Sequence, residues 1–261
     1  LNPLQLIIIA VSVSWFFFAL RFVNRNHRDA LLKSTFREKT ICLFMGWINP
    51  GLYYLILFSA YDQLPAQEAM AINYSWGITL AIVAAILLKQ TLSLRALLAA
   101  SISYMGILVI ATHGDPFSLE FVEPWGVGLA LLSTLIWSLY WVLNTRLNMD
   151  PEVSLFLNFS GAIPVLLLIT LLRSEPFLIP WQGWLGGLYI GLFEMGIAFV
   201  MWMGAMKAAS STIKISSLIF LSPPLSLLFI RLFTQEALEF YTLVGLGLIL
   251  GGLWIQHRFI R

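Results

Sequence analysis

The sequence predicts an all-α protein that crosses a membrane many times and consists of two related halves. Three observations support this. Of the 261 residues, 59% are hydrophobic and only 11% are charged, whereas a soluble domain carries about 25% charged residues. The apolar residues form long continuous runs, and the chain resembles itself at a fixed shift. This composition excludes an ordinary soluble domain and a nucleic-acid-binding protein, and a single cysteine, Cys42, excludes a disulfide framework.

Nine apolar runs are long enough for a helix to cross a bilayer core of about 30 Å. A helix is the expected structure because it satisfies its own backbone hydrogen bonds within lipid. The connections are short, so we expect no additional soluble domain. The runs lie at residues 4–23, 40–60, 66–88, 94–112, 125–147, 153–172, 184–206, 212–232 and 238–257.

The distribution of basic residues predicts the orientation of these helices. If the basic stretch 24–39 is cytoplasmic, alternation of the segments places every Lys and Arg on the inner side except Arg173 and Arg231. Cytoplasmic connections of membrane proteins are enriched in Lys and Arg. We therefore expect a multi-pass protein of a cell inner membrane with a cytoplasmic C-terminus.

The internal resemblance has a shift of about 145 residues and pairs segments one to four with segments six to nine. Residues 51–60 match 196–205, and 90–106 match 236–252. We expect two inverted five-helix repeats, over residues 1–113 and 124–261, with the first helix of the first repeat absent from this sequence. Inverted repeats are typical of secondary transporters, whose substrate site lies near the middle of the membrane.

Three motifs carry a resemblance to a known family: PAQEAMAINYSWG, the paired patterns Gln90…Gly106 and Glu236…Gly252, and LALLSTLIWSLYWVLNTR. With them the chain resembles the ten-helix EamA-type permeases of the drug/metabolite transporter superfamily. The resemblance implies ten helices, both ends cytoplasmic, and export or exchange of small metabolites. The NYSWG run also resembles the Asn-Tyr-x-Trp-Pro run of aromatic-amino-acid exporters, with Gly77 in place of the proline.

Glu194 is a candidate coupling or binding residue because it lies in the middle of an apolar segment. An unpaired carboxylate at that depth costs on the order of 3 kcal/mol, so it should face the protein interior. It can pair, bind a cation or take up a proton, and the alternative is a structural hydrogen bond to a neighbouring helix. Under the repeat, Glu194 lies opposite Asn49, which suggests a shared central cavity.

Further candidates lie where helices should bend or present a polar face. Pro50 should kink its segment next to Asn49, and Tyr53, one turn later, should share the face of Asn49. A simple packing kink is the alternative. The other candidates for substrate contact are Asn73, Tyr74 and Trp76 in segment three, Trp137 and Tyr140 in segment five, Asn158 in segment six and Trp202 in segment seven. Interhelical hydrogen bonds and lipid-facing aromatic packing are the alternatives for these residues.

Glycines at a spacing of four, such as Gly187 with Gly191 and Gly247 with Gly251, predict surfaces of close helix packing. The sequence contains no phosphate-binding loop of the GxxxxGK[ST] kind and indicates no cofactor or metal.

The sequence therefore favours a secondary transporter of a small metabolite, an amino acid or a related compound, that works by alternating access. Its expected partners are the small-molecule substrate, the lipid bilayer and protons. The alternative is an intramembrane lipid-modifying enzyme or protease. Such an enzyme needs a cluster of His, Asp, Glu or Ser near one membrane face, whereas His113 is expected on the opposite side from His27 and His257.

Overall fold

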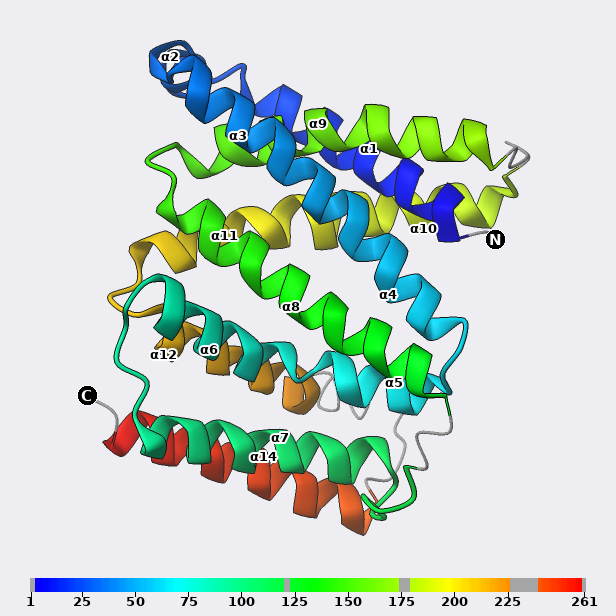
Figure 1. Cartoon of the computed structure of the whole chain (residues 1–261), viewed down its shortest axis with the longest axis vertical. Helices are drawn as coiled ribbons and strands as arrows, with labels where there is room; N and C mark the ends of the chain where they lie inside the picture. The colour runs from blue at the N-terminus through cyan, green and yellow to red at the C-terminus, as the bar shows by residue number, and fades with distance from the viewer. Residues whose placement is uncertain (1–2, 120–122, 174–178, 226–238, 260–261) are drawn as a thin grey trace. The chain divides into compact units, whose positions relative to one another are not determined.

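The computed structural model describes residues 3–119, 123–173, 179–225 and 239–259, and the regular elements in these residues are helices (Figure 1). The first part of the chain forms α1 (Pro3–Arg21), α2 (Arg25–Lys33), α3 (Phe36–Gly46), η1 (Trp47–Leu52), α4 (Tyr53–Tyr61), α5 (Ala66–Asn73), α6 (Trp76–Leu87) and α7 (Leu94–Ala111). The second part forms α8 (Pro124–Arg146), α9 (Pro151–Leu172), α10 (Trp181–Tyr189), η2 (Ile190–Ala198), α11 (Phe199–Ala208), α12 (Thr212–Ser216), η3 (Ser217–Leu221) and α14 (Phe240–Phe259). Arg231, Glu236 and the end of the eighth predicted segment lie outside the described residues.

Within the described residues, 7 stretches of helix are long and apolar enough to cross a membrane. Two of them join several elements: α3, η1 and α4 form one run of 26 residues, and α10, η2 and α11 form one of 28 residues. Two shorter apolar helices, Ala71–Leu87 and Thr212–Leu225, lie in the third and eighth predicted segments. The prediction of an all-α polytopic membrane protein is confirmed.

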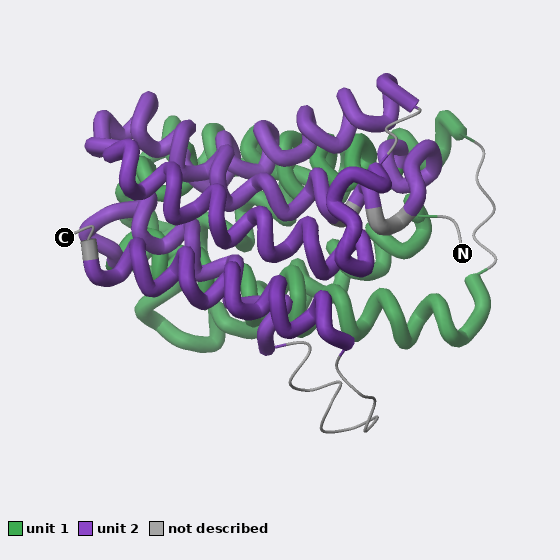
Figure 2. Tube along the Cα trace, turned by 90° about the horizontal axis from the view of Figure 1, so that it is seen from below, with its two compact units in different colours: residues 1–58, 143–208 green, residues 59–142, 209–261 purple. Residues whose placement is uncertain are grey.

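The chain forms two compact units, and each is built from two stretches that are separate in the sequence (Figure 2). Unit 1 comprises residues 1–58 and 143–208, and unit 2 comprises residues 59–142 and 209–261. Each unit therefore takes segments from both sequence halves. The boundaries of the predicted repeats, 1–113 and 124–261, stay a prediction.

In unit 1, α9 packs against α1 and α3, and glycines bring two of these backbones close together. A methyl group on Gly46 of α3 would overlap the carbonyl oxygen of Asn158 in α9, and one on Gly161 of α9 would overlap that of Leu43. On the other side of α1, the predicted packing glycines Gly187 and Gly191 meet its side chains and backbone. These contacts fix the helices that carry the site.

In unit 2, α7 and α14 lie side by side along their length (Figure 1). Gly245 approaches the backbone of Gly106, and Gly252 approaches Ser103. The prediction that Gly247 and Gly251 form the packing surface of this helix is wrong, because no described atom lies within 4 Å of a methyl group placed on either. The contact face of α14 is rotated from the one that the spacing of four suggests.

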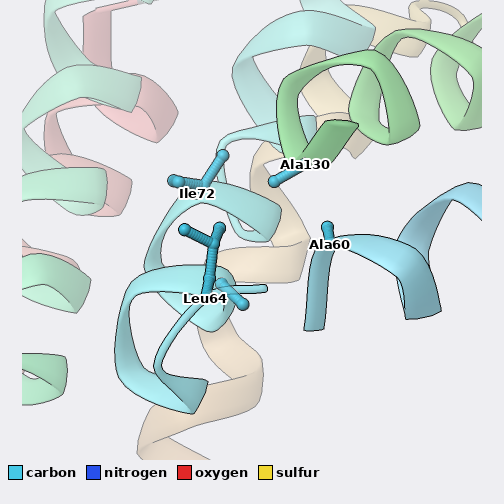
Figure 3. Packing of buried hydrophobic residues seen from close by; sticks show 5 residues of the cluster. Ala60, Leu64, Ile72 and Ala130 are labelled. Carbon is cyan, nitrogen blue, oxygen red and sulfur yellow. The ribbon is translucent and has the colours of Figure 1, made fainter. Parts of the chain in front are cut away.

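A small apolar cluster in unit 2 joins α4, α5 and α8 (Figure 3). Its members are Ala60, Leu64, Ala69, Ile72 and Ala130, all 6% exposed or less. The Tyr104 hydroxyl of α7 also donates to the Ala71 carbonyl of α5 at 2.9 Å. The cluster and this bond hold the end of α5, where Asn73 lies.

Helices are interrupted in both halves of the chain, at positions that the shift of about 145 residues relates. In unit 1, η1 and η2 are π-helical. In unit 2, Tyr74 and Ser75 separate α5 from α6, and α12 continues into the 3₁₀ helix η3. The sequence did not predict the interruption inside segment 66–88. Short polar side chains such as Asn73 and Ser75 compete with the helix backbone, and this favours a turn there.

Candidate functional site

The run from α3 to α4 breaks at Asn49. This residue has φ −146° and ψ 124°, an extended conformation inside a helical run. Pro50 explains the break, because it has no N–H to donate and its ring crowds the carbonyl of the preceding turn. The kink predicted at this position is confirmed.

The Asn49 side chain is 0% exposed, and in the described structure neither its Nδ2 nor its Oδ1 has a hydrogen-bond partner. Leaving a buried donor or acceptor unpaired costs about 1–3 kcal/mol. Unpaired buried polar groups are rare in native proteins and call for an explanation. At a break in a membrane-spanning helix, an open donor and an open acceptor are what a polar ligand requires.

Glu194 lies in η2, and the Tyr54 hydroxyl donates to its Oε1 at 3.3 Å. Tyr54 is 5% exposed, so the donor is fixed in the protein interior. Both residues belong to unit 1. Turns of π-helix are frequent at functional sites. The bond orients one carboxylate oxygen. Glu194 itself is exposed in the described structure, so the expectation that its side chain is enclosed in the protein interior is not met.

Regular α-helical spacing predicts Tyr53, at i+4, on the face of Asn49, and it did not predict Tyr54. Because Asn49 is extended, the regular helical spacing does not continue through it, and the residue after the kink that reaches Glu194 is Tyr54. Tyr53 is buried and packs edge-on against the Tyr54 ring at a centroid distance of 4.8 Å. Pro50 was the available signal that the regular spacing ends here.

Asn158 in α9 is equally buried but has a partner. Its Nδ2 donates to Asn144 Oδ1 at 3.2 Å, and the Ser154 hydroxyl donates to the same oxygen at 2.9 Å. These bonds join the end of α8 to α9 and give Asn158 a structural contact. Trp202 lies in α11 of the same unit and is partly buried.

The aromatic candidates of unit 2 form a connected set of rings. Trp76 at the start of α6 meets Trp137 of α8 edge-on, with centroids 6.0 Å apart. Trp137 in turn meets Trp141 at 5.5 Å, and Trp141 meets Tyr140 at 5.0 Å. Tyr140 and Trp141 are 0% exposed, so these two rings fix the position of the set, and Trp137 is only partly buried.

Polar candidates flank these rings at the interruption between α5 and α6. The Nδ2 of Asn73 is buried and has no hydrogen-bond partner in the described structure. The Tyr74 hydroxyl lies 3.2 Å from Ser222 Oγ, next to the tandem prolines that follow η3. Unit 2 therefore resembles unit 1 in one respect: each has a side-chain amide nitrogen without a hydrogen-bond partner, close to a helix break.

The structure thus groups the predicted residues in two sets. One set, in unit 1, is Asn49, Tyr53, Asn158, Glu194 and Trp202, and the other, in unit 2, is Asn73, Tyr74, Trp76, Trp137 and Tyr140. A cavity of about 330 Å³ in unit 1 lies elsewhere, among α1, α9 and α10. Its lining is apolar except for Gln5, Ser12 and Thr170, and it includes none of the predicted residues.

Membrane-spanning helices that are broken next to buried polar groups are typical of membrane transporters. The chain belongs to the EamA-like transporter family, whose family model matches residues 1–112 and 124–256. Membership implies a small-molecule substrate and a membrane location, and it indicates a transporter rather than an enzyme.

Relatives agree with this assignment. PecM of Dickeya dadantii is 26% identical over 217 residues, which cover 81% of this chain and 71% of PecM. The aromatic amino acid exporter YddG of Ancylobacter novellus is 26% identical over 204 residues, or 77% of this chain and 70% of YddG. The uncharacterized transporter YxxF of Bacillus subtilis is 20% identical over 202 residues, or 77% of this chain and 64% of YxxF.

A solved crystal structure has the same fold, with a TM-score of 0.80 at 22% sequence identity. The match covers 99% of this chain and 89% of that chain.

Proposed function

We propose that the protein is a secondary transporter that exports or exchanges an amino acid or a closely related amine-bearing metabolite. Substrate binds near the middle of the membrane between the two inverted repeats, and alternating access exposes it to each side. The distribution of Lys and Arg supports an inner-membrane location with a cytoplasmic C-terminus.

The hydrogen bond between Tyr54 and Glu194 carries this proposal. A carboxylate at membrane depth is costly and marks a functional site. Tyr54 orients one oxygen, so the other is available to a proton or to a substrate ammonium group. We propose that proton and substrate bind at Glu194 in turn, which couples transport to the pH gradient.

Each unit carries further groups of the kind that bind an amino acid. The unpaired amides of Asn49 and Asn73 offer donors to a substrate carboxylate. The rings of Trp76, Trp137 and Tyr140 suit an apolar or aromatic side chain. The printed name of YddG, an aromatic amino acid exporter, supports this substrate class.

Flux into proteoliposomes that contain the purified protein tests the proposal. A panel of radiolabelled amino acids, with phenylalanine, tryptophan, threonine and lysine as representatives, is assayed with and without a pH gradient. We expect Glu194→Gln to abolish gradient-driven flux, because an amide carries no titrating proton and attracts an ammonium group only weakly. Glu123→Gln is the matched control, since Glu123 lies exposed before α8.

Two results would contradict the proposal. Flux by Glu194→Gln with unchanged gradient dependence would remove the coupling role. Recovery of the added compound in chemically altered form, detected by mass spectrometry, would favour the enzyme alternative.

A further inference from the structure

The stretch between α1 and α3 must lie at one membrane face, because each of these helices belongs to a candidate membrane span. One candidate span is Pro3–Arg21, and the next is Phe36–Tyr61. Between them the chain forms the short helix α2, which begins at the Asn24 N-cap and ends before Ser34. Figure 1 shows α2 at the end of the hairpin formed by α1 and α3. From this position we expect α2 to lie at the level of the lipid headgroups.

One face of α2 packs against the rest of unit 1. Ala30 and Leu31 pack against an apolar cluster that includes Cys42 and Val153. His27 lies 3.2 Å from Asp150 and 3.4 Å from Glu152, at the start of α9. Arg21 at the end of α1 forms a two-pronged pair with Glu152, at 2.7 and 2.9 Å. These contacts hold α2 in place and determine which face it turns outward.

The outward face combines positive charge with exposed apolar side chains. Arg25, Arg28 and Lys33 are exposed on α2, and Asp29 is the single acidic residue among them in the described helix. Leu32, next to Lys33, is 77% exposed. Just beyond the helix ends, Val23 is 79% exposed and Phe36 is 86% exposed. Exposed apolar side chains beside basic ones are the combination found on helices that lie in the membrane interface.

We propose that the outward face of α2, formed by Arg25, Arg28, Leu32 and Lys33, is together with Phe36 at the start of α3 a binding surface for anionic lipid headgroups. The basic side chains bind the phosphates, and Leu32 and Phe36 insert between the headgroups. Helices with a basic face and exposed apolar residues lie in the membrane interface in this way. Arg21 takes no part, because its guanidinium is paired with Glu152.

The depth of residue 32 in membranes of defined composition tests the proposal. The full chain, with Cys42→Ser and Leu32→Cys, is labelled at position 32 with an environment-sensitive fluorophore and placed in nanodiscs of phosphatidylcholine with increasing phosphatidylglycerol. We expect a blue shift of the emission that grows with the anionic lipid and is reduced by high salt. Salt screens charge interactions beyond about 10 Å at 0.1 M.

Two matched double substitutions distinguish a lipid-binding site on α2 from a general attraction between the net charge of the protein and the anionic membrane. In the labelled protein, Arg25→Gln with Arg28→Gln should raise several-fold the fraction of phosphatidylglycerol needed for half of the shift, since each basic residue near an anionic surface contributes about 5-fold in affinity. Lys89→Gln with Arg95→Gln removes the same charge from two exposed positions outside α2 and should leave the titration unchanged.

Either of two outcomes would overturn the proposal. One is an emission that stays characteristic of water at every lipid composition, which would leave this face to a water-soluble partner protein. The other is an equal effect of both double substitutions, which would show that net charge alone governs the response. Flux measurements do not enter this test, so it stands apart from the proposed transport function.

Discussion

The approach of α3 to α9 leads to a sharp prediction about Gly46. A Cβ at this position would overlap the carbonyl oxygen of Asn158 and lie 2.7 Å from its carbon and 3.0 Å from the Ala162 nitrogen. All three are backbone atoms, which cannot rotate away, so Gly46→Ala must push α3 off α9. Overpacking of this kind costs about 1–3 kcal/mol, and alanine regains up to about 1 kcal/mol through its helix propensity. We expect a net loss of about 1–2 kcal/mol in the free energy of unfolding.

The assay is thermal unfolding of the purified protein in detergent, followed by tryptophan fluorescence. Gly204→Ala in α11 is the matched control, because no described atom lies within 4 Å of a methyl group placed there. The control should melt at or slightly above the temperature of the unmodified protein, and Gly46→Ala should melt clearly below it. Equal melting of the two variants would refute the close approach of α3 and α9.

Three further substitutions test individual contacts. Asn49→Leu should raise the free energy of unfolding by about 1–3 kcal/mol, because it removes an unpaired buried amide, and should abolish flux; a less stable variant that still transports would contradict the binding role. Tyr54→Phe keeps the ring but removes the donor to Glu194, so flux should fall several-fold with little change in melting temperature; full activity would show that the bond is dispensable. Lys207→Met removes an ammonium group that donates to the carbonyls of Leu147, at 3.0 Å, and of Met149, so unfolding should become easier by about 1–3 kcal/mol; unchanged denaturation would assign no stability to this contact.

Composition and the lengths of apolar runs were sufficient to predict the membrane-spanning helices, because lipid leaves a long apolar segment few alternatives. The faces on which these helices pack were harder to predict. In α14 the contacts fall on Gly245 and Gly252, whereas Gly247 and Gly251 meet nothing described. When nearly every side chain is apolar, several helix faces satisfy the same spacing, and only the neighbouring helix decides between them.

The candidate site shows the same limit. Asn49 and Asn158 look alike in the sequence, as single amides in apolar segments, but Asn144 supplies a partner to one of them only. That difference depends on a residue from another helix, which no local pattern specifies. Tyr54 was missed because the helix breaks at Asn49, so α-helical spacing counted from Asn49 no longer tells which residue faces Glu194. Proline predicted the break itself but not the spacing that follows it.

Labelling of Glu194 by a carbodiimide tests the central claim most directly. These reagents react with protonated carboxyl groups in apolar surroundings, and mass spectrometry locates the modified residue. We expect Glu194 to be labelled, labelling to be absent in Glu194→Gln, and the amino acid with the highest flux in the panel to protect Glu194 at saturating concentration. Labelling at an unchanged rate in the presence of that transported amino acid would contradict the assignment of Glu194 to the substrate site.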